Sequence, residues 1–117
     1  MRHAQQPIAD RLADDPRPVD EWAEGMRRLP PLLYVHDPEL SRGMEAWIQS
    51  MVSRAANLDC IGTDDPIAPP VGAPAREVLG YFFQRWPEGG AEYRRLISRA
   101  DQLLGRARLL DALGATG

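Results

Sequence analysis

The prolines of this chain constrain its fold more than any other feature of the sequence. Residues 59–74, DCIGTDDPIAPPVGAP, contain four prolines and two glycines among sixteen residues. Proline lacks a backbone N–H and fixes its φ angle, so this stretch can form neither a regular helix nor a central strand. We therefore expect a long extended connector, partly polyproline II, between two helical parts of the chain.

The clearest helix signal precedes this connector. Asp37 is a suitable N-cap, Pro38 fits the first helical position, and Glu39 suits the positive end of the helix dipole. Apolar residues then recur at i, i+4, i+7, i+8, i+11, i+12 and i+15, which predicts an amphipathic helix of about four turns. The stripe consists of Leu40, Met44, Trp47, Ile48, Met51, Val52 and Ala55.

Shorter helices are expected nearer the N-terminus. One can begin at Pro7, and a second can begin after Asp20 as its N-cap. The second helix carries one apolar stripe, made of Trp22, Met26 and Leu29. We expect Pro30–Pro31 to end it, because the residue before a proline is disfavoured in helical geometry. Leu32–Val35 is then expected to be extended or turn-like.

Two further helices are predicted after the connector. Pro74 can begin the first, and Trp86–Pro87 with Gly89–Gly90 is expected to form the turn that follows. The last helix is predicted over 91–113, with apolar residues at spacings 3-4-3-4-3, an a/d seam of just under three heptads. This C-terminal seam consists of Tyr93, Leu96, Ala100, Leu103, Ala107 and Leu110.

Two glycines bear on this last helix. Gly105 falls opposite the C-terminal seam, so we expect it to weaken the helix without breaking it. Gly114 is the expected C-terminal stop. A continuous helix of this length would run the whole length of a small domain or project from it.

The resulting prediction is an all-α fold of about four helices, with a long Pro-rich connector and a long C-terminal helix. No stretch shows strand alternation and no internal repeat is present. We expect a polar lead-in at 1–18 and a single helical domain over 19–113 that contains the connector at 59–74. An aromatic core cluster is expected from Trp22, Trp47, Trp86, Phe82, Phe83 and Met51.

Composition narrows the class of protein. Leu, Ile, Val and Phe make up 21% of the 117 residues, which is enough for a core but not a rich one. The single cysteine, Cys60, excludes an internal disulfide and favours a reducing compartment. The apolar stretches are far shorter than the roughly 20 residues that a membrane span needs, and no secretory signal is visible. We expect a cytoplasmic protein with no membrane partner.

Residues that could carry chemistry are scattered. His3, His36 and Cys60 lie in three separate segments without the paired spacing of a metal site or a nucleophile motif. The acidic pairs Asp14–Asp15, Glu21–Glu24 and Asp64–Asp65 suit turns and first helical turns. We therefore expect no enzymatic activity, no metal and no cofactor.

Charge is distributed unevenly along the chain. Its net charge is −3, all basic side chains are arginine, and the excess of arginine over acid falls in residues 75–117. Arg95, Arg99 and Arg106 share one face of the last predicted helix, where they could contact phosphates or an acidic partner. A nucleic-acid-associated regulator is therefore one hypothesis, although the net negative charge of the chain disfavours it.

The hypothesis that we favour is a non-enzymatic helical interaction or assembly protein. A small hydrophobic core and a helix with an a/d seam favour a small structural subunit of a larger complex, such as a phage particle or a secretion machine. Self-association or docking is expected through the C-terminal seam. The connector would add an arm, with Pro66, Pro69 and Pro70 laid across a neighbouring subunit.

Overall fold

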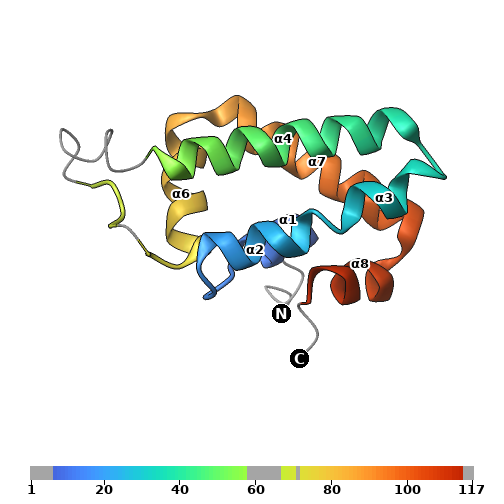
Figure 1. The fold of residues 1–117 in the computed structure, drawn as a ribbon, viewed down its shortest axis with the longest axis horizontal. Coiled ribbons are helices and arrows are strands. Elements are labelled where there is room, and N and C mark those ends of the chain that lie inside the picture. The colour runs from blue at the N-terminus through green and yellow to red at the C-terminus, as the bar shows by residue number, and fades with distance from the viewer. Residues whose placement is uncertain (1–6, 58–66, 71, 115–117) are drawn as a thin grey trace.

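The computed structural model describes residues 7–57, 67–70 and 72–114, which are mainly helical (Figure 1). Strand-like pairing within these ranges is limited to one isolated antiparallel bridge, between Pro18 and Pro74. The predicted all-α fold is therefore confirmed. The helices are α1 (Ile8–Ala13), α2 (Val19–Met26), α3 (Leu29–Tyr34), α4 (Pro38–Ala56), α6 (Ala75–Arg85), α7 (Pro87–Leu104) and α8 (Arg106–Leu113).

Helix α4 follows its predicted pattern closely. It begins at Pro38, and the Asp37 carboxylate accepts a hydrogen bond from the backbone N–H of Leu40 at 3.1 Å. This bond satisfies one of the N–H groups that have no acceptor inside the helix. Five apolar residues of its stripe are buried: Leu40, Met44, Trp47, Ile48 and Met51.

Helix α3 corrects the expectation for Leu32–Val35. Pro30 and Pro31 lie in the first turn of a helix that runs from Leu29 to Tyr34, so most of this segment is helical rather than extended. Prolines are tolerated there because the first N–H groups of a helix have no intrahelical acceptor to lose. Helix α2 ends earlier than predicted, at Met26, so the two prolines belong to the first turn of α3 rather than to the end of α2.

The start of α7 also differs from the prediction. Trp86 is its N-cap, and Gly89 and Gly90 lie inside the helix rather than in a turn before it. The indole of Trp86 packs against this first turn so closely that a Cβ atom at Gly89 would lie 2.1 Å from the ring. Glycine is required at that position for steric reasons.

The predicted continuous helix over 91–113 is wrong. Gly105 adopts φ 89° and ψ 152°, which separates α7 from α8. Only glycine populates this region readily, so the residue breaks the helix rather than merely weakening it. Helix α8 then folds back, and its residues Leu109, Ala112 and Leu113 enter the core.

The C-terminal end of α8 is held by α2 and its flanking residues. A Cβ atom at Gly25 would lie 2.7 Å from the carbonyl oxygen of Leu113, so the two backbones approach closely. Arg17 donates to the carbonyl of Leu113 and Arg28 to that of Ala112, each at 3.2 Å. Cations there complement the negative end of the helix dipole.

The predicted meeting of the three tryptophans is confirmed. The Trp47 ring lies 6.0 Å from that of Trp22 and 6.4 Å from that of Trp86, and it stacks on Tyr93 at 5.0 Å. The indole N–H of Trp47 donates to the carbonyl of Gly89 at 2.9 Å. Met51, Phe82 and, partly buried, Phe83 belong to the same core.

The N-terminal segment packs with the rest of the domain. Ile8, Ala9 and Leu12 of α1 are buried, and the Tyr93 hydroxyl donates to the carbonyl of Ala9 at 2.7 Å. Burial, with a smaller effect from the nearby charge of Asp10, raises the pKa of Tyr93, so its phenol stays protonated. The described part of the predicted lead-in is therefore a component of the core.

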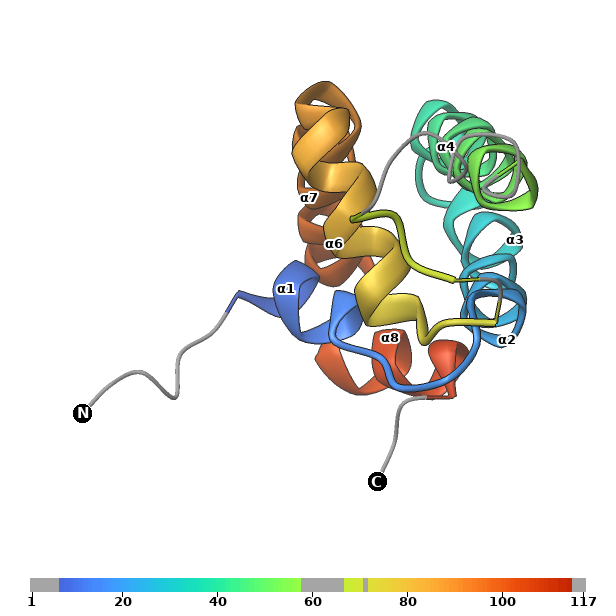
Figure 2. The same ribbon diagram turned by 90° about the vertical axis from the view of Figure 1, so that its left-hand side faces the viewer.

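The segment before α2 also anchors the start of α6. The N–H of Ala75 donates to the carbonyl of Arg17 at 2.7 Å, and the N–H of Arg76 donates to that of Asp15 at 2.9 Å. Figure 2 shows the consequence: α6 and α7 form one side of the molecule, α4 with α3 and α2 forms the other, and α8 lies across the base.

Candidate interaction groove

The C-terminal seam faces mainly into the chain itself. Tyr93, Leu96 and Ala100 are each at most 2% exposed and belong to the core. Leu103 and Leu110 are half-buried, and only Ala107 is exposed. The break at Gly105 separates the residues on its two sides into different helices. Half of the predicted partner-binding residues therefore contact α1, α4 and α6 of the same chain instead of a free surface.

The three arginines predicted to meet phosphate or an acidic partner are exposed, but each has a neighbour. Arg95 forms an ion pair with Glu92, and Arg106 donates two hydrogen bonds to Asp101 at 3.2 and 3.1 Å. Arg99 donates to the side-chain oxygen of Gln102 at 3.3 Å. The hydrogen bonds to Asp101 raise the pKa of Arg106. Carboxylates thus offset much of the positive charge of this face.

The other predicted positions lie apart from one another. Pro66 of the connector arm, His3 and Cys60 fall outside the described residues. Pro69 is half-buried, and Pro70 is exposed beside the C-terminal end of α4. His36 is exposed just before the cap of α4.

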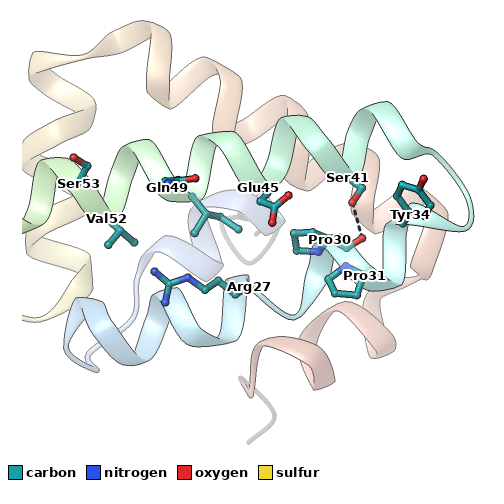
Figure 3. A pocket seen from close by; sticks show the side chains of 10 residues that line it. Arg27, Pro30, Pro31, Tyr34, Ser41, Glu45, Gln49, Val52 and Ser53 are labelled. Carbon is teal, nitrogen blue, oxygen red and sulfur yellow. Dashed lines mark hydrogen bonds between the residues drawn. The ribbon is translucent and has the colours of Figure 1, made fainter.

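A groove, not expected from the sequence, lies along one side of α4. Its volume is about 780 Å³. Figure 3 shows α4 forming one wall, and α3 with the end of α2 forming the other. The residues of this α4 groove are Arg27, Pro30, Pro31, Tyr34, Ser41, Glu45, Ile48, Gln49, Val52 and Ser53.

One hydrogen bond fixes the two walls of the groove where α3 meets α4. The buried Ser41 hydroxyl donates to the carbonyl of Pro30 at 2.7 Å and holds α3 against α4. Helix α3 has only six residues and is followed directly by the turn into α4, so it lies beside only the first part of α4. From Ser41 to Ser53 the wall of α4 is about 18 Å long at 1.5 Å per residue.

The groove combines an apolar floor with an apolar rim. Ile48, Val52 and Pro30 contribute carbon to its lining. At its α3 end, Tyr34 is 55% exposed and the adjacent Val35 is 79% exposed. A monomeric protein gains nothing from leaving such groups together in water, and such patches commonly mark interaction sites.

Two smaller hollows continue the α4 groove toward the connector. One shares Arg27 and Val52 with it, and the next shares Val52 and adds Ala55 and Pro70. The groove and the first of these hollows are lined by four carboxylates and one guanidinium. These charged residues are Asp20, Glu21, Glu24, Glu45 and Arg27. We call the four carboxylates the acidic flank.

The acidic flank has little internal neutralisation. Within the described ranges no ion pair involves any of its four carboxylates or Arg27. Glu21 has only a weak electrostatic interaction with Arg17. Its charge helps to raise the pKa of Arg17, but Asp15 has the larger effect. The groove itself has one carboxylate, Glu45, and one guanidinium, Arg27. The excess of negative charge lies in the adjoining hollow, which Asp20, Glu21 and Glu24 line.

No group of three or more His, Cys, Asp or Glu in the described ranges could hold a metal ion. None of the helices there is long and apolar enough to cross a lipid bilayer. Comparison with protein-family models, curated proteins and solved structures found no match for this chain.

The sequence contains only a weak signal for the groove. Leu32–Val35 is apolar and directly precedes the cap of α4, which leaves Tyr34 and Val35 on a short helix with little to cover them. Val52, an expected core residue, is half-buried, because the short helix α3 lies beside only the first turns of α4. The groove exists because of where α3 packs on α4, and the sequence pattern does not reveal that position.

Proposed function

We propose that this chain is a non-enzymatic interaction protein that holds an apolar segment of another protein in the α4 groove. The observation that supports this proposal is the groove itself: about 780 Å³, with an apolar floor and the exposed Tyr34 in its lining. An amphipathic helix laid into an apolar groove is a common mode of peptide recognition. The proposal places the protein in a larger assembly, in the cytoplasm.

The α4 groove supports this role better than the two surfaces expected from the sequence. The C-terminal seam offers few free apolar residues, since Tyr93, Leu96 and Ala100 are in the core. The arginine face offers little free positive charge, because Arg95 and Arg106 have carboxylate partners. Binding of nucleic acid through that face therefore remains the weaker alternative.

Selection of peptides against the purified protein tests this proposal. The library displays random peptides of about 16 residues, slightly more than the roughly 12 that would span the groove as a helix. We expect enriched peptides with apolar residues at helical spacing. Their binding should fall about tenfold or more in Gln49→Arg, which places a long charged side chain over the apolar floor.

The matched control is Gln84→Arg, the same exposed substitution on α6, away from the groove. It should leave binding unchanged. The proposal fails if no peptide is enriched, or if the enriched peptides bind Gln49→Arg and Gln84→Arg equally well. Circular dichroism of both variants confirms that each has kept its helical fold.

A further inference from the structure

We infer that the segment bound in the α4 groove is a basic amphipathic helix of the partner protein, with lysine or arginine flanking its apolar stripe. This inference rests on the proposed function and adds the chemistry of the partner. Charge complementarity between the acidic flank and the partner supports it.

The dimensions of the groove favour a helix over an extended peptide. The α4 wall is about 18 Å long, which matches about 12 helical residues, or just over three turns. An extended strand would need an unpaired sheet edge for its backbone hydrogen bonds. The described residues offer no such edge, because they form helices and one isolated bridge. A helix satisfies its own backbone groups and presents only side chains.

The acidic flank decides the charge of that helix. Glu45 lines the α4 groove itself, whereas Asp20 and Glu24 of α2 line the smaller hollow that adjoins it and shares Arg27 and Val52 with it. A helix that lies in the groove and extends over this hollow would have carboxylates on both sides of its apolar stripe. Basic residues beside the stripe would pair with them, whereas acidic ones would meet like charges. Because the described residues give these carboxylates no ion-pair partner, their charge is free for a ligand.

Arg27 adds a single positive group where the α4 groove meets the first smaller hollow. It lies about midway along the groove wall, as Figure 3 shows. One acidic residue in the partner helix, flanked by basic ones, would match it. The expected pattern is therefore an apolar stripe, mostly basic flanks and one acidic position that fixes the register.

Fluorescence anisotropy with three labelled synthetic peptides tests this inference. All three, of about 16 residues, share one apolar stripe at i, i+3, i+4, i+7 spacing and differ only in having lysine, glutamine or glutamate at the flanking positions. At about 0.01 M salt we expect the lysine peptide to bind about tenfold tighter than the glutamine peptide, and the glutamate peptide to bind weakest. At about 1 M salt the differences should nearly vanish, since the Debye length falls to about 3 Å.

Two double variants locate the effect. Glu24→Gln with Glu45→Gln should remove most of the preference for the lysine peptide while keeping the affinity for the glutamine peptide. Glu77→Gln with Glu88→Gln, at exposed acidic positions of α6 and α7, should leave the preference unchanged. The expected loss is specific to the charges of the groove and of the hollow that adjoins it.

The outcomes separate this inference from the proposed function. Equal binding of all three peptides, lost in Gln49→Arg, would overturn the basic partner and keep the groove as the site. A lysine preference that both double variants retain would place the attraction elsewhere on the surface and overturn the inference. If none of the peptides binds, the inference is rejected as well, and the peptide selection decides the proposed function.

Discussion

At the scale of single residues, the pair of Asp15 and Arg17 joins three parts of the fold. The Asp15 carboxylate accepts hydrogen bonds from the backbone N–H of Arg17 at 2.9 Å and from its guanidinium at 2.6 Å. The same guanidinium donates to the carbonyl of Leu113 at the end of α8. Burial by itself would raise the pKa of Asp15, but the hydrogen bonds and charge of Arg17 lower it overall.

This lowered pKa predicts a loss of stability in acid. A carboxylate with a lowered folded-state pKa stabilises the protein above its unfolded pKa of about 3.9, and that contribution disappears as the pH falls through the folded-state value. At pH 7, Asp15→Asn should lower the free energy of unfolding by about 1–2 kcal/mol, because Arg17 is partly exposed. The difference from wild type should shrink below about pH 4.

Urea unfolding of wild type and variant across this pH range measures the effect. Asp14→Asn is the control, since Asp14 is the exposed neighbour of Asp15. It should change stability by less than about 0.5 kcal/mol. A gap between wild type and Asp15→Asn that stays constant from pH 7 to pH 3 would contradict the role assigned to this ion pair.

Sequence reasoning succeeded at residues whose role is local. The cap made by Asp37 and the position of Pro38 follow from the first few residues of α4 alone. The meeting of Trp22, Trp47 and Trp86 followed from their places on apolar stripes, which must be buried somewhere. In contrast, Gly105 was misjudged because its effect depends on how α8 packs against α2.

At the scale of elements, the break between α7 and α8 converts a possible partner-binding helix into part of the core. Gly105 has φ 89°, and no atom lies within 4 Å of the place a Cβ would take, so space is not the restriction. The backbone conformation is the restriction. A periodic pattern continued across Gly105, and periodicity cannot reveal a reversal of direction at one glycine.

Alanine at Gly105 tests this account of the break. Gly105→Ala should lower the free energy of unfolding by about 1–3 kcal/mol, since alanine strongly disfavours this backbone conformation. Gly80→Ala is the matched comparison, because Gly80 is exposed, helical and surrounded by open space. It should raise stability by about 0.5–1 kcal/mol through helix propensity.

Thermal and urea unfolding of the two variants measure both changes in the free energy of unfolding. Hydrogen exchange adds the location: amides of α8 should exchange faster in Gly105→Ala, whereas those of α4 should change less. If Gly105→Ala were as stable as wild type, a continuous helix through residue 105 would be accessible at little cost. The C-terminal seam would then again be a candidate interaction surface.

At the scale of the whole molecule, the chain uses its helices in two ways. Helices α2, α4, α6 and α7 carry the aromatic side chains of the core, and α1 and α8 add further buried residues to it. The other face of α4 borders the α4 groove, because α3 is too short to cover it. The sequence could indicate that α4 is amphipathic. It could not indicate that the neighbouring helix, α3, has only six residues and leaves part of α4 uncovered.

The central claim is that the α4 groove, and not the C-terminal seam, is the surface that binds a partner. The most direct measurement is the change in backbone amide chemical shifts when the lysine peptide is added to the isotopically labelled protein. We predict that the largest shifts fall at Arg27, Tyr34, Glu45, Gln49 and Ser53, with little change along α7 and α8. Shifts concentrated instead at Leu103, Ala107 and Leu110 would contradict the claim and return the interaction to the C-terminal seam.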